Sequence, residues 1–165
     1  MQEAATQPTV PAIFVLEARA EPASALDRVL AGTIALAALS LLLVACWLTP
    51  ASGGVDTHTQ LGLAKCGWLS RSGIPCMTCG MTTSFALVAD GRLLAALWVQ
   101  PFGTVLALLT VFVFWVAGYI AVTARPVWRL LPRWPAGYTT LLVGLAAGLA
   151  WGWKIAIHLL GLDGC

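Results

Sequence analysis

The run that decides the fold reads Ile34-Ala-Leu-Ala-Ala-Leu-Ser-Leu-Leu-Leu-Val-Ala-Cys46-Trp47, and it lies inside an uncharged segment from Val29 to Leu48. A helix needs about twenty predominantly apolar residues to cross the hydrocarbon core of a bilayer. Pro50 and the glycines after it end the run, because they do not continue a helix. The segment therefore predicts a membrane span over residues 29–49.

Two further apolar runs are long enough to cross a membrane, over residues 102–124, which carries no charge, and 136–160. The chain has 165 residues, of which 59% are hydrophobic and only 10% charged, outside the range that is usual for soluble proteins. We therefore expect an all-α membrane protein with a single membrane domain, residues 29–165, three transmembrane helices and contact with the lipid bilayer. A dispersed net charge of +2 argues against binding to nucleic acid.

The remaining segments are shorter or more polar. Residues 1–28 mix prolines with charges and predict a flexible arm. Residues 50–80 predict a folded loop that contains cysteines. Residues 81–90 and 92–100 predict two short helices, which at about 1.5 Å per residue cannot cross a bilayer. We expect these two helices to be interfacial or re-entrant.

Three cysteines gather in the predicted loop. Cys76 and Cys79 form a C-x-x-C pair at the start of the first short helix, and Cys66 lies upstream of them. Thiolates are ligands for soft metal ions, and a C-x-x-C turn can hold two sulfurs on one ion. With His58, these cysteines would make a Cys3His set suited to tetrahedral zinc, and Cys165 is a substitute for the histidine.

The same cysteines allow two other structures. A disulfide from Cys66 to Cys76 or Cys79 would staple the loop in an oxidising compartment. Cys76 and Cys79 could instead catalyse thiol–disulfide exchange, because a helix start favours the thiolate. We favour a structural metal or disulfide site over this enzymatic alternative. No glycine-rich phosphate loop, H-E-x-x-H or G-x-S-x-G motif is present to support a nucleotide-binding or hydrolase function.

The third predicted span carries small and ionisable residues. Gly144, Gly148 and Gly152 recur every four residues and share a face on which a helix of this chain or of a second copy could pack. Lys154 and His158 also share a face, which suggests a small transporter or pore subunit as a weaker alternative. Because Lys154 is near the end of the span, we favour extension of its amine to the outer interface. The alternative is a pair with Asp90, Asp56 or Asp163.

A specific set of motifs surrounds the cysteines. It comprises Gly73-Ile74-Pro75-Cys76-x-x-Cys79-Gly80-Met81-Thr82, then Asp90-Gly91-Arg92-Leu93-x-Ala95-Ala96 and Gln100-Pro101-Phe102-Gly103. In this combination the chain resembles small bacterial membrane proteins of the domain of unknown function 2752 family, from about residue 57 to the end of the second span. The resemblance implies no activity. Met77 stands where the family usually has proline, and Thr83 where it usually has arginine.

Basic residues predict the orientation. The arm and the loop between the second and third spans hold Arg19, Arg28, Arg125, Arg129 and Arg133, whereas the other side holds Lys65, Arg71 and Arg92. By the positive-inside rule the N-terminus is cytoplasmic. We therefore expect a multi-pass protein of the bacterial inner membrane, with the cysteine loop and the C-terminus outside.

Overall fold

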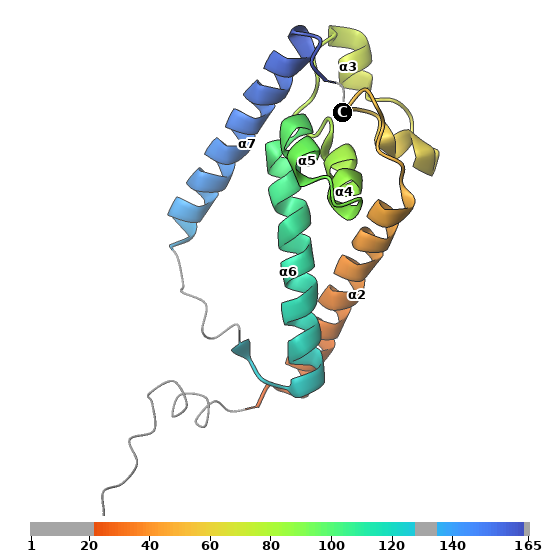
Figure 1. Cartoon of the computed structure of the whole chain (residues 1–165). Helices are drawn as coiled ribbons and strands as arrows, with labels where there is room; N and C mark the ends of the chain where they lie inside the picture. Colours follow the sequence, from red (N-terminus) through yellow and green to blue (C-terminus); the bar gives the residue numbers. More distant parts are fainter. Residues whose placement is uncertain (1–21, 128–134, 164–165) are drawn as a thin grey trace, which may run out of the picture.

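The computed structural model describes residues 22–127 and 135–163, and every regular element in these residues is a helix (Figure 1). Three of the helices are long and apolar enough to cross a membrane: α2 (Ala25–Trp47), α6 (Pro101–Thr123) and α7 (Ala136–Leu159). The predicted all-α fold with three long apolar helices is confirmed. Most of the predicted arm, Arg129, Arg133 and Cys165 lie outside the described residues.

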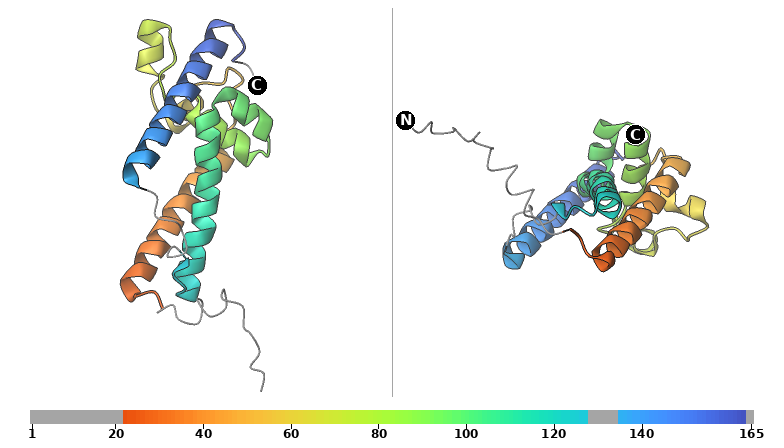
Figure 2. Two further views of the ribbon diagram at one scale, coloured as in Figure 1. Left: turned by 90° about the vertical axis from the view of Figure 1, so that its left-hand side faces the viewer. Right: turned by 90° about the horizontal axis from the view of Figure 1, so that it is seen from below.

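Helices α2 and α6 lie side by side in all views (Figures 1 and 2). Helix α2 begins with a capping box, in which the Ser24 hydroxyl accepts from the amide of Asp27 and the Asp27 carboxylate accepts from the amide of Ser24. The buried residues of α2 are all alanines, which allow close approach of α6. At the same end of α2 as the capping box, the amide of Ala23 donates to the carbonyl of Ala124, which follows α6, at 2.7 Å.

Four shorter helices gather where α2 ends and α6 begins (Figure 1). They are η1 (Thr57–Leu61), α3 (Gly67–Ser72), α4 (Met81–Ala89) and α5 (Leu93–Val99). Helix α4 packs against α5 and α6 around the fully buried Leu87, Ala96 and Val99. The predicted loop thus contains two helices, η1 and α3, that the sequence analysis did not predict. Each is too short to show an apolar periodicity.

Helix α7 is displaced toward the end of the molecule that carries the short helices (Figures 1 and 2). The second half of α7 contacts α5 through two tryptophans. The indole N–H of Trp153 on α7 donates to the carbonyl of Trp98 on α5 at 2.8 Å, and the two rings meet edge to face with centroids 5.1 Å apart. The glycine face is open, because a Cβ built at Gly144, Gly148 or Gly152 meets nothing within 4 Å in the described chain.

Candidate metal centre

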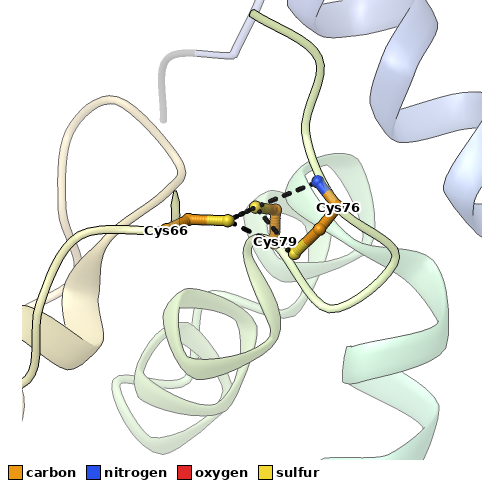
Figure 3. Close-up of side chains that lie close together, drawn as sticks. All are labelled: Cys66, Cys76 and Cys79. Carbon is orange, nitrogen blue, oxygen red and sulfur yellow. Dashed lines mark hydrogen bonds between the residues drawn. The ribbon is translucent and has the colours of Figure 1, made fainter. Parts of the chain in front are cut away.

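The three loop cysteines converge on one point, although Cys66 comes from a different segment than the C-x-x-C (Figure 3). The Sγ atoms of Cys66 and Cys76 are 3.5 Å apart, those of Cys66 and Cys79 3.4 Å, and those of Cys76 and Cys79 3.2 Å. All three are free thiols, and Cys79 is buried while the other two are partly exposed. The three sulfurs form a nearly equilateral triangle beside the turn that precedes α4.

This triangle fits a single metal ion. An ion at about 2.3 Å from each sulfur, the usual Zn–S distance, would lie about 1.2 Å from the plane of the sulfurs. Sulfurs of a regular tetrahedral zinc site are about 3.8 Å apart, so binding requires each pair to separate by a few tenths of an ångström. An iron–sulfur cluster fits less well, because an iron atom of such a cluster binds at most two cysteines, so three cysteine sulfurs do not converge on one atom.

Two different segments hold Cys66 and the C-x-x-C. The amide of Cys66 donates to the Asp56 carboxylate at 3.4 Å, which anchors the start of α3. The amide of Cys76 donates to the sulfur of Cys79 at 3.3 Å within the turn. Gly80, with φ at +88°, ends this turn and is the N-cap of α4. A non-glycine residue would be strained at that φ.

Side chains from α7 and from the start of α6 hold the carbonyls of the same turn. Trp151 Nε1 donates to the carbonyl of Pro75 at 2.9 Å, and Gln100 Nε2 donates to the carbonyl of Met77 at 3.0 Å. The sequence analysis did not assign a site role to Trp151 or Gln100. The only available signal was the polar Gln100 between two apolar helices.

The environment shifts the pKa values of two thiols in opposite directions. Burial raises the pKa of the Cys76 thiol, but hydrogen bonds with Thr78, Cys79 and Cys66 lower it by more, from the ordinary 9.0 to about 7. For Cys79, burial raises the pKa, and the neighbouring thiols of Cys76 and Cys66 raise it further. Cys76 is therefore the thiol that ionises first, and its thiolate is the form that binds metal or attacks a disulfide.

The predicted ligand His58 is not in the cysteine group. Its Nε2 lies 3.0 Å from the carbonyl oxygen of Ala64, within the loop that leads to Cys66. The group of close metal-type donors in the described residues comprises Cys66, Cys76 and Cys79 alone. In this structure the imidazole contacts another part of the loop and is not among the donors that lie close to the three sulfurs.

Lys154 is buried within the chain and paired, whereas the interpretation that we favoured from the sequence expects an exposed, extended side chain. Its side chain is 0% exposed, and its ammonium donates to Asp163 Oδ1 at 2.9 Å and to the carbonyl of Gly54 at 3.3 Å. The other oxygen of Asp163 contacts Nδ1 of His158. The correct alternative was the pair with Asp163, which forms because Gly161, with φ at +68°, turns the chain back after α7.

These features define a class of protein: an all-helical chain with three helices of membrane-spanning length and a cluster of three thiols at one end. The family described as "Protein of unknown function (DUF2752)" matches residues 66–114, from the first clustered cysteine into α6. This match supports membership of the chain in that family and confirms the resemblance seen in the motifs. Helix α7 lies outside the matched residues. Comparisons with curated proteins and with solved structures find no match.

Proposed function

We propose that this protein is a small structural or accessory component of a membrane, whose cysteine loop holds one zinc-like ion through Cys66, Cys76 and Cys79. The observation that carries the proposal is the triangle of sulfurs, 3.2 to 3.5 Å on each side, built from two separate segments of the chain. A bound ion would join these segments and thus stabilise a loop that has few buried apolar side chains of its own.

A fourth ligand would complete a closed structural site. We propose Cys165 for this position in preference to His58. Asp163, two residues before Cys165, is anchored to Lys154, and a Cβ built on Gly80 would lie 3.5 Å from the Cε of the same lysine. These contacts bring the chain before Cys165 close to the residue that follows Cys79, whereas the imidazole of His58 already contacts Ala64.

Metal analysis of the purified protein, prepared under reducing conditions, tests this function. We expect one zinc per chain and, after exchange with cobalt(II), the absorption bands of a thiolate-rich tetrahedral site. Replacing Cys165 by serine should change the cobalt spectrum, whereas replacing His58 by glutamine should not. A protein that retains no metal and shows a stable disulfide between two of the three cysteines would instead support a structural staple.

A thiol–disulfide oxidoreductase is the second candidate, and the opposite pKa shifts of Cys76 and Cys79 favour it. An exposed thiolate next to a buried thiol is the arrangement in which the first attacks a substrate disulfide and the second resolves the mixed disulfide. Reduction of a quinone to quinol, with oxidation of the Cys76–Cys79 dithiol to a disulfide, would support this enzyme. The Lys154–Asp163–His158 group offers less support for a transporter, because these charges pair with one another.

We also propose that the cysteine loop faces outward from the inner membrane and that the N-terminal arm is cytoplasmic. The excess of arginines that the sequence places in the arm and in the loop between the second and third spans supports this orientation. Labelling of intact cells with a membrane-impermeant maleimide tests it, in a variant that retains Cys66 as the only cysteine. Labelling only after the cells are lysed would reverse the proposed topology.

A further inference from the structure

Two side chains of α7, one turn apart, contact the loop that carries the C-x-x-C. Trp151 donates its indole N–H to the carbonyl of Pro75, the residue directly before Cys76. Lys154, which is fully buried, donates to the carbonyl of Gly54 in the loop after α2. Because residues at i and i+3 lie on the same side of a helix, one face of α7 meets two segments of this loop.

The side chain of Lys154 also lies close to the residue that follows the C-x-x-C, where two glycines allow a close approach. A Cβ built on Gly80, the residue directly after Cys79, would lie 3.5 Å from Cε of Lys154 and 3.0 Å from the carbonyl oxygen of Gly54. Gly54 and Gly80 have φ angles of +64° and +88°, which glycine adopts without strain. The aliphatic part of Lys154 is therefore in close contact with these two glycines. This contact lies next to Cys79, a ligand of the proposed metal site.

The ion pair with Asp163 restricts Lys154 to this place. Burial of an ammonium group is costly unless it is paired and hydrogen-bonded, and here the partner carboxylate is itself only 15% exposed. The carboxylate also contacts His158, one turn farther along α7. With its ammonium fixed in this way, the lysine has little freedom to move away from Gly80.

We propose that Trp151 and Lys154 are positioning residues for the cysteine site: they hold Pro75 and Gly80, the two ends of the C-x-x-C turn, and thereby set the separation of the Cys76 and Cys79 sulfurs. The proposal rests on the metal-binding function proposed above. Hydrogen bonds around the ligands of a metal commonly change its affinity by 10- to 100-fold. If the contacts of α7 strengthen metal binding, thermodynamic linkage requires that metal binding strengthens the contacts of α7 with the cysteine loop by the same factor.

The substitution Trp151→Phe is the sharpest test, since it keeps an aromatic ring and removes the N–H that holds Pro75. The matched control is Trp47→Phe, because Trp47 is 69% exposed at the end of α2. In cobalt(II) titrations of the full chain in detergent, we expect about tenfold weaker binding for Trp151→Phe and unchanged binding for the control. Lys154→Met, which keeps most of the stem and removes the charge, should weaken binding in the same direction.

Hydrogen exchange distinguishes positioning from general stabilisation. In the wild-type protein, zinc should slow the exchange of amides in the second half of α7, and Trp151→Phe should reduce this zinc effect. A residue that only stabilises the fold would speed exchange equally with and without zinc. That result, or cobalt affinity equal to wild type in Trp151→Phe, would overturn the inference.

A measurement without metal tests the positioning role of Trp151 separately. If the wild-type protein binds neither zinc nor cobalt, that result refutes only the proposed metal-binding function, and the measurement can still be made. In a Cys66→Ser background, the Cys76–Cys79 pair is equilibrated with reduced and oxidised glutathione. Each protein disulfide that forms consumes one oxidised glutathione and releases two reduced ones. Trp151→Phe should lower this equilibrium constant about fivefold, the contribution of one hydrogen bond, while Trp47→Phe leaves it unchanged. Equal constants for Trp151→Phe and its parent would refute the positioning role.

Discussion

The hydroxyl groups of Thr57 and Thr83 lie 2.8 Å apart, and both side chains are fully buried. Thr57 also accepts a hydrogen bond from the amide of Ala51 at 3.0 Å. This contact joins η1 to α4 across 26 residues of sequence and fixes the loop from which Cys66 departs. Thr83 is also one of the two positions at which the chain departs from the motif that it resembles, so the departure has a structural role here.

Replacing Thr83 by valine should lower the free energy of unfolding by about 1 kcal/mol, because the buried Thr57 hydroxyl loses one of its two hydrogen-bond partners. Unfolding by sodium dodecyl sulfate in mixed micelles, followed by circular dichroism, measures the change. The control is Thr33→Val, since Thr33 is exposed on α2 and bonds only to its own helix. Equal losses in the two variants would contradict a specific role for the Thr57–Thr83 bond.

Replacing Cys66, Cys76 or Cys79 by serine should in each case lower the zinc content to well below one ion per chain, because each substitution removes one of the proposed thiolate ligands. Cys46→Ser is the matched control, as this exposed thiol lies on α2 and is not in the cysteine cluster. Elemental analysis of detergent-purified protein provides the measurement. Full zinc content in Cys66→Ser would limit the site to the C-x-x-C pair.

In reduced, metal-free protein, Cys76 should react fastest with iodoacetamide near neutral pH. Its pKa is lowered to about 7, so about half is thiolate at pH 7, against about 1% for a thiol at the ordinary value of 9.0. Its reaction rate should rise with pH and level off above about pH 8. Cys79, whose pKa is raised by burial and neighbouring thiols, should react slowly throughout this range. Peptide mass spectrometry resolves the two sites, and a faster Cys79 would contradict the assignment.

Lys154→Met should lower the free energy of unfolding by about 3 kcal/mol, because it leaves the carboxylate of Asp163 without its cationic partner. Adding Asp163→Asn to this variant should recover part of the loss, since the unpaired charge is then removed. Unfolding of both single variants and the double variant gives the coupling energy. Additive losses would show that the two residues do not interact.

Gly54→Ala should destabilise the fold by more than about 2 kcal/mol. Its Cβ would lie 2.4 Å from the carbonyl oxygen of Asp163, and its φ of +64° is unfavourable for alanine. Gly148→Ala is the control, because a Cβ there meets nothing within 4 Å and alanine favours the helix. Thermal unfolding of both variants compares them. A large loss of stability in Gly148→Ala would indicate that a second molecule packs on the open glycine face.

The three long helices could be predicted from the sequence, because each is a continuous apolar run that satisfies its backbone hydrogen bonds within its own segment. It also placed Cys76 and Cys79 together, since a C-x-x-C turn keeps its two sulfurs close whatever the rest of the chain does. The motif across the cysteines and α5 was sufficient to find the resemblance that the family match supports. None of these features depends on contacts between distant segments.

Which residues join the cysteine pair depends instead on contacts between distant segments. Cys66 approaches it because the Thr57–Thr83 bond and the Asp56 carboxylate fix a loop whose length alone allows many conformations. The same contacts leave His58 facing Ala64. Lys154 is buried against Asp163 rather than exposed because the turn at Gly161 brings the chain back onto α7. Such pairings depend on the packing of several segments at once, which no local pattern of residues encodes.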